Sequence, residues 1–299
     1  MYGVIFLYRI SDYTMVSSAI LKKEVVSYGV KMTGAQYEWN ETKGKGIKVG
    51  IIDTGVDINH EDLIVENYAN FTSDDKEDVC DLSGHGTHVA GIVGARMNGL
   101  GVVGVAPECE LYIAKAFDGQ GKGEKNSIIK SLLWMLKNEV DIINMSFSST
   151  EGCEEEEKIV QQCIENNIFL VAAAGNRGER KVTYPGKYKG VVAVSSVDIN
   201  KVKSDFSSYG NEIDLAAAGV DILSTYKNNS YAVLSGTSMA APLISGAAAL
   251  IQAKALKRFK RKLTPKELEI VMGIYADNTE AGRKSKCCGC GIFSFGRIN

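Results

Sequence analysis

Residues 47–55 read Ile47-Lys48-Val49-Gly50-Ile51-Ile52-Asp53-Thr54-Gly55, an apolar run that ends on a carboxylate and a glycine. Short continuous runs of Val and Ile are typical of strands that are buried on both faces, as in a parallel sheet. Open α/β sheets bind their ligands at the carboxyl ends of the strands, so Asp53 is well placed for function. The alternative is a turn aspartate, which is common where strands end.

The same pattern recurs along the chain, and helical segments lie between the apolar runs. The runs are Ile47–Ile52, Asp141–Met145, Ile168–Ala173 and Val191–Val197. The helical segments are Ser127–Lys137, Lys158–Asn166, the small-residue stretch Met239–Leu256 and a helix that begins at the capping box Thr264–Glu267. Alternating strands and helices predict an α/β fold of three layers, in which a mostly parallel central sheet lies between helices.

The composition of the 299-residue chain is that of a globular protein. Hydrophobic residues make up 45% and charged residues 23%, which excludes disordered, collagen-like and membrane-channel classes. The 34 basic and 36 acidic residues leave a net charge of −2, so we expect no nucleic-acid partner. We interpret the basic run Lys254–Lys262 as the solvated end of a helix. The apolar run Val4–Leu7 is too short to span a bilayer, so no membrane association is expected.

The cysteines bear on the cellular compartment. There are seven of them, at positions Cys80, Cys109, Cys153, Cys163, Cys287, Cys288 and Cys290. Their odd number and irregular spacing argue against a secreted disulfide framework and favour the reducing cytoplasm. A secreted protein with a signal peptide cleaved near Ala19 is the alternative. For the cluster Cys287–Cys290, metal binding, lipid attachment and an ordinary terminal segment all remain open.

Only three histidines are present, so a histidine general base must be His60, His85 or His88. Two of them lie in the segment Gly84-His85-Gly86-Thr87-His88-Val89-Ala90-Gly91. The structural alternative is a buried helix start with a hydrogen-bonded histidine. A metal pair of His85 and His88 is a second alternative, although the glutamate and the third ligand of zinc motifs are missing.

Two further segments carry polar side chains at the ends of elements. The segment Leu234-Ser235-Gly236-Thr237-Ser238-Met239-Ala240-Ala241-Pro242 places Ser238 at the start of a helix, where free backbone N–H groups favour developing negative charge. An N-cap serine is the alternative. The segment Val171-Ala172-Ala173-Ala174-Gly175-Asn176 places Asn176 beyond a strand end, where its NH2 group is able to donate to an oxyanion. A turn asparagine is the alternative there.

The four segments follow one another in the order Asp, His, Asn, Ser. The motifs Asp-Thr-Gly, His-Gly-Thr-His and Gly-Thr-Ser-Met-Ala-x-Pro, in this order, resemble those of the subtilisin-like serine proteases. The resemblance covers roughly residues 24 to 299. Within the family, the chain is most similar in character to the intracellular subtilisins. The resemblance implies the subtilisin-like fold and peptide-bond hydrolysis. It also implies that Asp53 orients His85 and that His85 is the general base for Ser238. Asn176 and the backbone N–H of Ser238 would bind the oxyanion, and His88 would be structural.

The resemblance further implies a polypeptide substrate that lies as an extended strand between two clamp segments, Gly121-Lys122-Gly123 and Ser146-Phe147-Ser148. Ser148 and Ser149 stand where many members of the family have glycines, which predicts a narrower pocket. Arg177 follows the oxyanion asparagine, at the rim of the pocket for the residue before the scissile bond. Its charge is expected to disfavour Lys or Arg in that pocket and to favour acidic side chains.

A structural calcium ion is the one cofactor that the resemblance implies. The segment Asn98–Val102 resembles the calcium loop of the family, whose oxygen ligands suit a hard cation. The expected ligands are the side chains of Asp62 and Asn98 and the carbonyl groups of Arg96, Leu100 and Val102, with Glu24 as an addition. The segment Tyr184–Tyr188 with Asp214 resembles a weaker second cation site.

We divide the chain into an N-terminal extension, residues 1–22, and a peptidase domain, residues 23–299. The part before the catalytic aspartate is too short for the folded propeptide of secreted members of the family. The apolar segment Tyr2–Tyr8 has high β-propensity, so we predict that it lies along the two clamp segments as an inhibitory, substrate-like strand. The alternative is that Val4–Leu7 packs on the body of the protein.

The predicted function is that of a serine endopeptidase acting on polypeptides. A dedicated processing protease for one peptide precursor is an alternative that the narrowed pocket would suit. Asp-Thr-Gly also occurs in aspartic proteases, but these need two such aspartates and this chain has a single copy. A catalytically silent binding module is the alternative outside enzymes. The sequence predicts neither the physiological substrate nor the oligomeric state.

Overall fold

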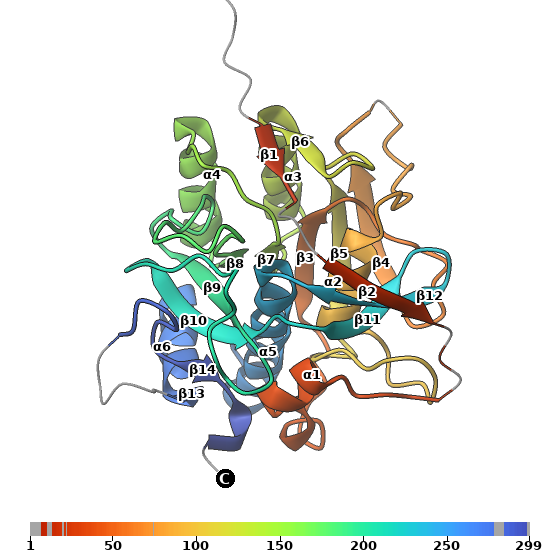
Figure 1. The fold of residues 1–299 in the computed structure, drawn as a ribbon, viewed down its shortest axis with the longest axis vertical. Coiled ribbons are helices and arrows are strands. Elements are labelled where there is room, and N and C mark those ends of the chain that lie inside the picture. The colour runs from red at the N-terminus through yellow and green to blue at the C-terminus, as the bar shows by residue number, and fades with distance from the viewer. Residues whose placement is uncertain are drawn as a thin grey trace, which may run out of the picture.

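The computed structural model describes residues 7–10, 14–19, 21, 23–73, 75–277 and 284–297 (Figure 1). Within these residues nine strands form one central sheet in the order β13-β14-β10-β9-β8-β7-β3-β5-β4, and all neighbours are parallel except β13 and β14. The strands are β3 (Lys48–Asp53), β4 (Val65–Asn70), β5 (Glu110–Lys115), β7 (Ile142–Met145), β8 (Phe169–Ala173), β9 (Val191–Val197), β10 (Ile213–Ala218), β13 (Ala276–Asp277) and β14 (Ile292–Phe293). The predicted mostly parallel sheet is therefore confirmed.

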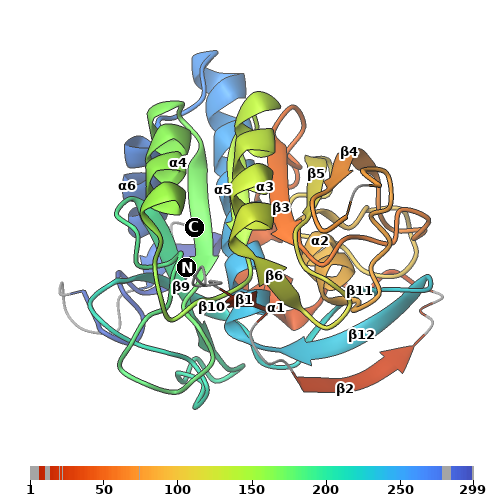
Figure 2. The ribbon, with the colours of Figure 1, turned by 90° about the horizontal axis from the view of Figure 1, so that it is seen from above.

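Helices cover both faces of the central sheet (Figure 2). They are α1 (Tyr28–Thr33), α2 (His85–Gly94), α3 (Lys125–Lys137), α4 (Glu154–Glu165), α5 (Thr237–Phe259) and α6 (Pro265–Tyr275). Helices α2 and α5 pack together on one face, where one hydrophobic cluster lies, and α3 and α4 pack together on the other face over a second cluster. This is the predicted arrangement of three layers.

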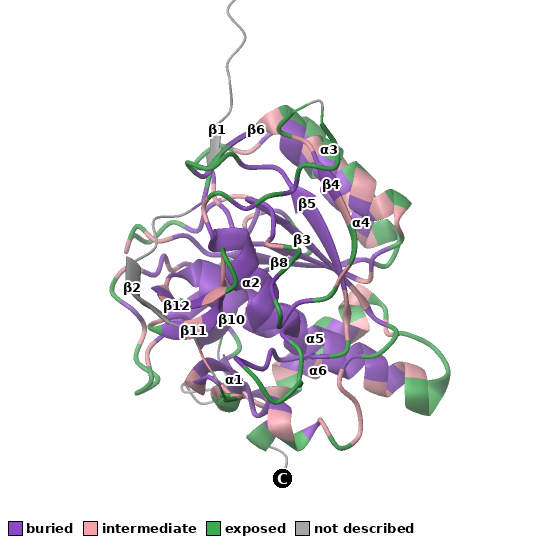
Figure 3. Ribbon diagram, turned by 90° about the vertical axis from the view of Figure 1, so that its right-hand side faces the viewer, coloured by how far each residue is buried: buried purple, intermediate pink, exposed green. Residues whose placement is uncertain are grey.

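Helix α5 is long and apolar enough to cross a membrane by length and composition, but most of its residues are buried inside the protein. Figure 3 shows it as a largely buried element at the centre of the fold. Its first half consists mainly of small residues, which allow the sheet and α2 to approach closely. It is therefore the central core helix that the sequence predicted.

The boundaries of the helices differ in part from the predicted ones. Helix α4 begins at Glu154 and not at Lys158, because the acidic run forms its first turn, where the helix dipole favours negative charge. The capping box of α6 is present as predicted: Thr264 accepts from the backbone N–H of Glu267, whose side chain accepts from the backbone N–H of Thr264.

Two smaller sheets lie at the carboxyl-end side of the central sheet; the sequence analysis predicted no strand of the first and, in the second, only a strand of Tyr2–Tyr8 beside Gly121–Gly123. One contains β11 (Ile222–Tyr226), β12 (Ser230–Ser235) and β2 (Thr14–Ala19), in the order β11-β12-β2. The other pairs β1 (Leu7–Arg9) with β6 (Lys122–Glu124). Both contain a strand from the N-terminal extension, so the extension is part of the folded structure (Figures 1 and 2).

Candidate active site

Asp53 and His85 form a buried pair where the last residue of β3 meets the first residue of α2. The Nδ1 atom of His85 lies 2.7 Å from Oδ1 of Asp53, and neither side chain has exposed surface. Because an ionised carboxylate only accepts hydrogen bonds, we place a proton on Nδ1 of His85, which donates it to Asp53. A Cβ atom on Gly86 would lie 2.2 Å from the carbonyl oxygen of Gly55, so a glycine at this position is what lets the helix start approach the strand end.

Asp81 joins the two elements that carry this pair, and the sequence analysis did not identify it. Its Oδ1 accepts from the hydroxyl of Thr54 at 2.8 Å and from the N–H of Gly84 at 2.8 Å. Its Oδ2 accepts from the N–H of Thr87 at 2.8 Å. The carboxylate thus binds the turn after β3 and the first turn of α2 at once. The sequence did contain a local signal for this role, because Asp81 lies four residues before His85, the first residue of a helix, where aspartate side chains often bind free backbone N–H groups.

Ser238 is the second residue of α5 and is fully buried. Its Oγ donates to the carbonyl oxygen of Ser146 at 3.0 Å, and the hydroxyl of Ser146 donates to the carbonyl oxygen of Ser238 at 3.0 Å. Ser146 directly follows β7. These two hydrogen bonds fix the start of α5 against a strand end, and they place the serine where the helix dipole favours negative charge.

Asn176 follows β8, and its side-chain amide is held in one orientation by Thr237. Its Oδ1 accepts from the N–H of Thr237 at 2.9 Å and from the Thr237 hydroxyl at 2.7 Å. A Cβ atom on Gly236 would lie 3.1 Å from Nδ2 of Asn176, so the NH2 group is on the side of the start of α5. Thr237 is a second positioning residue that the sequence analysis missed, because nothing in the local pattern links it to Asn176.

His88 is buried on α2 and takes no part in this cluster. Its Nε2 lies 3.0 Å from the carbonyl oxygen of Ile222 and 3.1 Å from that of Ala232, so Nε2 carries the proton and donates. Burial, and secondly the neighbouring His85, lowers the pKa of His88 to about 3, which makes the ring neutral. A metal pair of His85 and His88 does not fit, since each ring faces a different partner, and the described residues hold no group of three or more His, Cys, Asp or Glu that suits a metal.

The extension binds along both clamp segments. The N–H of Arg9 donates to the carbonyl oxygen of Ser148 at 3.1 Å, and the N–H of Ser148 donates to that of Arg9 at 2.9 Å. The N–H of Ile10 donates to the carbonyl oxygen of Gly121 at 2.9 Å. The buried side chain of Ile10 belongs to the hydrophobic cluster of Phe117 and Phe147. Phe147 is the middle residue of the second clamp segment.

This strand continues the predicted one towards the C-terminus. The predicted segment was Tyr2–Tyr8, of which residues 2–6 lie outside the described residues, and the strand that pairs is Leu7–Arg9. The alternative packing of Val4–Leu7 likewise falls mostly outside the described residues.

Lys122 faces solvent between the two buried glycines of its clamp segment. Arg177 is exposed beside Asn176.

The loop with the predicted calcium ligands brings three oxygen-bearing side chains together. Oδ2 of the buried Asp62 accepts from the N–H of Val102 at 2.7 Å, and Oδ1 accepts from Nδ2 of Asn98 at 3.0 Å. Oε2 of Glu24 accepts from the N–H of Gly99 at 2.8 Å. Carboxylate and amide oxygens around one tight loop are a donor set that suits a hard cation. The carbonyl-bearing residues Arg96 and Leu100 are exposed in the same loop.

The second cation site is not supported. Asp214, its expected carboxylate, lies 2.5 Å from the ammonium group of Lys284 and accepts from the N–H of Ala193 at 3.0 Å. A side-chain cation therefore already binds this carboxylate.

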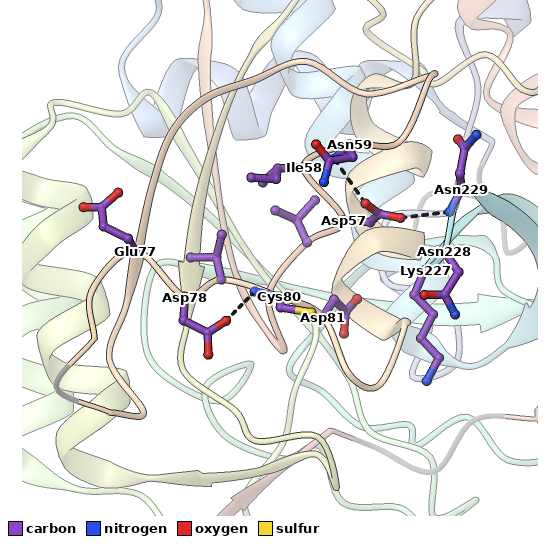
Figure 4. A pocket seen from close by; sticks show the side chains of 12 residues that line it. Asp57, Ile58, Asn59, Glu77, Asp78, Cys80, Asp81, Lys227, Asn228 and Asn229 are labelled. Atoms are coloured by element: carbon purple, nitrogen blue, oxygen red, sulfur yellow. Dashed lines mark hydrogen bonds between the residues drawn. The ribbon is translucent and has the colours of Figure 1, made fainter.

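A pocket of about 540 Å³ lies beside the site and shares Asp81 with it (Figure 4). Its lining includes Asp57, Glu77, Asp78, Cys80 and the turn residues 227–229, but none of the four predicted catalytic residues. Asp57 accepts from the N–H groups of Asn59 and Asn229, and Asp78 accepts from that of Cys80, so these carboxylates stabilise turns. We assign no ligand to this pocket.

Comparison with known proteins gives a consistent result. Residues 44–291 match the family described as the subtilase family, Peptidase_S8. The chain is 43% identical over 250 residues to the intracellular serine protease of Paenibacillus polymyxa, which covers 80% of this chain and 77% of that protein. It is 42% identical over 252 residues to the major intracellular serine protease of Bacillus subtilis (strain 168), covering 80% and 79%. It is 42% identical over 236 residues to subtilisin DY of Bacillus licheniformis, covering 77% and 86%.

Proposed function

Since the chain belongs to the subtilase family and is a serine endopeptidase, we propose that Asp53, His85 and Ser238 are its catalytic triad and that Asn176 binds the oxyanion. The observation that carries this proposal is the buried contact of 2.7 Å between His85 and Asp53, with Ser238 at the start of a helix on the same edge of the sheet. A substrate carbonyl at this edge would meet a nucleophile, a base and an amide donor together.

The proposed reaction has two halves. The Oγ of Ser238 attacks the scissile carbonyl carbon while Nε2 of His85 takes its proton, and Asp53 stabilises the imidazolium that forms. Nδ2 of Asn176 and the backbone N–H of Ser238 donate to the oxyanion. His85 then gives the proton to the leaving amine, and a water molecule repeats the sequence on the acyl-enzyme, which frees Ser238 and the new carboxyl group.

Two inhibitors distinguish this mechanism from that of an aspartic protease. A serine-directed phosphonate is expected to stop cleavage of a peptide library and to add its mass to the peptide that contains Ser238, whereas a statine inhibitor leaves the rate unchanged. Labelling of another residue with full loss of activity would contradict the assignment. Absence of any cleavage by the chain with its extension removed would favour a silent binding module.

Arg177 is proposed to set a charge preference at the residue before the scissile bond. Its exposed guanidinium beside Asn176 is expected to weaken cleavage after Lys or Arg relative to acidic or small residues, since like charges repel at close range. Arg177→Glu is expected to reverse this preference in a library digest, and Arg180→Glu, nearby on the same exposed loop, serves as the control. An unchanged profile would mean that Arg177 points away from the pocket. A profile restricted to one sequence would favour a dedicated processing protease.

The N-terminal extension is proposed to inhibit the enzyme by occupying the clamp. Its backbone makes the three hydrogen bonds of Arg9 and Ile10 along the clamp segments. A substrate strand that uses the same backbone groups of Ser148 and Gly121 must displace the extension before its carbonyl group reaches Ser238. A tethered strand has an effective concentration on the order of millimolar, so weak intrinsic binding is sufficient.

Replacing Ile10 with glutamate in the full-length chain is therefore expected to raise activity on a small peptide substrate at least several-fold. The buried side chain would place a charge in the cluster of Phe117 and Phe147, which is costly enough to release the strand. Arg9→Ala is the matched control, since the exposed Arg9 contributes backbone hydrogen bonds that alanine keeps. Added peptide Met1–Ile20 is expected to inhibit the Ile10→Glu variant. Equal activities of wild type and Ile10→Glu would leave the extension a packing element.

A structural calcium ion is proposed at the loop of Asn98, with Asp62 and the carbonyl groups of Arg96, Leu100 and Val102 as further ligands. It would stabilise the folded state by mass action, because the ligands meet only when the chain is folded; at 100 times the Kd the gain is about 2.7 kcal/mol. We expect chelation to lower the Tm by several degrees and to speed autolysis. Asn98→Ala, at an exposed position, is expected to remove most of this difference, whereas Asn200→Ala, also exposed, keeps it. A Tm that chelation does not change would contradict the proposal.

A cytoplasmic location is proposed on two grounds. All seven cysteines lie within the described residues and none is in a disulfide bond, which suits a reducing compartment, and two of the most similar relatives are named as intracellular proteases. Cell fractionation with an antibody to the peptidase domain distinguishes this location from secretion.

A further inference from the structure

Of the lysines and arginines that the structure describes, Lys115 alone is buried. It is the last residue of β5, and its ammonium group donates to the carbonyl oxygen of Cys80 at 2.8 Å. It forms no ion pair with a carboxylate in the described part of the chain. Burying a charge away from opposite charges is costly, so carboxylates are expected in the wider surroundings of this ammonium group.

Lys115 lies directly beside the aspartate of the proposed triad. In the register of β3 and β5, Asp53 pairs with Lys115, on strands that are roughly 4.8 Å apart. Side chains alternate along a strand, so Asp53 points to the same face as Ile51, and Lys115 points to the same face as Ile113. Both isoleucines belong to the hydrophobic cluster that includes residues of α2. The ammonium group and the carboxylate therefore lie on one side of the sheet, the side of α2.

Two buried aspartates, Asp53 and Asp81, have their carboxylates close together at this place. Both bind Thr54, Asp53 through its backbone N–H at 2.8 Å and Asp81 through its hydroxyl at 2.8 Å. Oδ1 of Asp53 also contacts His85, whereas Oδ2 is buried and accepts no hydrogen bond from a described residue. Like charges that are buried near each other disfavour the ionised state of both, and a positive charge beside them offsets this effect. The ammonium group of Lys115 carries such a charge.

Resting on the catalytic triad proposed above, we propose that Lys115 is a positioning residue of this triad. Its hydrogen bond holds the carbonyl group of Cys80, which directly precedes Asp81, and its charge balances the two carboxylates beside His85. A positive charge at this place also opposes protonation of the imidazole, so His85 remains a free base at lower pH. The ionisable groups that the elements around the start of α2 bring together are those of Asp53, Asp81, Lys115, Tyr226 and His88, of which His88 is neutral.

Replacing Lys115 with methionine is expected to shift the pH profile of kcat/KM, measured in the full-length Ile10→Glu variant on a short peptide. Without the positive charge His85 is protonated more easily, so the acid limb of the profile moves to higher pH by about half a pH unit or more. On that limb kcat/KM falls roughly threefold or more. KM at the plateau is expected to stay the same, because the hydrogen bond of the Lys115 side chain does not reach the clamp segments.

Two further variants separate the charge from the packing of the side chain. Lys115→Arg keeps the charge and is expected to keep the profile of the parent enzyme. Lys48→Met is the matched control, because the ammonium group of Lys48 also donates to a carbonyl oxygen, that of Asn138 at 3.0 Å, but at the opposite end of β3. Its profile is expected to be unchanged.

A second readout does not depend on activity. The chain has only three histidines, so the NMR signals of the His85 ring are followed against pH in the full-length Ser238→Ala variant. Adding Lys115→Met is expected to raise the midpoint of the His85 titration by the same amount as it moves the acid limb. Lys115→Gln, which is also neutral, repeats the test if the methionine variant does not fold.

An unchanged midpoint in the neutral variants would overturn the proposal, and so would an equal shift in Lys115→Arg or in Lys48→Met. Failure of the catalytic assignment is a different result. It would appear as peptide cleavage that does not require Ser238, whether or not the His85 midpoint moves.

Discussion

Replacing Ser238 with alanine is expected to lower kcat for peptide hydrolysis by roughly four to six powers of ten, while the fold remains intact. The magnitude is the one found for the triad of subtilisin, a member of the same family, and is carried over from there. Its physical basis is that nucleophile and base act as one unit. Without the hydroxyl, His85 has no proton to accept, and only substrate positioning and oxyanion binding remain.

The thermal unfolding curve and the activity are measured on the same preparation. Ser238→Ala removes an oxygen that donates one hydrogen bond, to the carbonyl group of Ser146, so we expect a Tm change of a few degrees at most. Ser73→Ala, on an exposed loop, is the control and keeps full activity. His85→Ala is expected to be as inactive as Ser238→Ala, and the double variant no worse than either. Activity of Ser238→Ala within tenfold of wild type would remove the triad assignment.

Replacing Asn176 with alanine is expected to lower kcat by about 100- to 1000-fold with little change in KM. This magnitude, too, is carried over from the corresponding measurement on subtilisin. The amide nitrogen would contact the substrate oxygen mainly when that oxygen carries negative charge, so its loss is felt in the transition state. Asn166→Ala, at the exposed end of α4, is the control and is expected to have no effect.

Thr237 provides a finer test of the same assignment. Its backbone N–H and hydroxyl both bind Oδ1 of Asn176, so Thr237→Val keeps one of the two contacts and is expected to cost clearly less than Asn176→Ala. The amide would be shown not to bind the oxyanion if the loss of activity in Asn176→Ala also appeared as a change in KM, or if this variant kept the wild-type kcat.

The central sheet was predictable where strands are apolar throughout, and less so where charged residues interrupt them. Strand β9 matches the predicted range Val191–Val197. Strand β5 was missed because it begins with Glu110 and ends with Lys115, although Lys115 is buried and its ammonium group donates to the carbonyl oxygen of Cys80 at 2.8 Å. Strand β10 contains Asp214, which an apolar-run criterion excludes.

The hairpin of β11 and β12 was missed for a different reason. Its turn contains Asn228 and Asn229, both with positive φ, a conformation that asparagine tolerates better than most residues. The pair of asparagines between two alternating segments was therefore an available signal. The pairing of β2 with β12, by contrast, joins residues that are more than 200 positions apart in the chain. No local pattern in Thr14–Ala19 specifies such a partner.

The four candidate catalytic residues could be named from the sequence because their types and order match the family. Their mutual orientation could not, since it depends on Asp81 and Thr237, whose hydrogen bonds join segments that are distant in the chain or unrelated by pattern. Of the predicted strand Tyr2–Tyr8, the described residues Leu7 and Tyr8 lie beside the expected clamp segment, and the contacts continue two residues further than predicted. Ile10 extends it, because its buried side chain fills a place beside Gly121 that an apolar-run criterion applied to Tyr2–Tyr8 did not reach.

The two ladders of the extension bear on how a cell could tolerate such an enzyme. The extension pairs with the peptidase domain twice, through Leu7–Ile10 beside the clamp segments and through Thr14–Ala19 beside β12. A substrate that binds in the same way must offer a comparable length of unpaired, extended chain. Native proteins seldom expose one, because their own sheets and helices already use these backbone groups, and local unfolding on that scale costs free energy. We therefore expect the stability of each host protein to be its protection: well-folded neighbours persist beside the active enzyme, whereas damaged, unassembled or newly unfolded chains are degraded first.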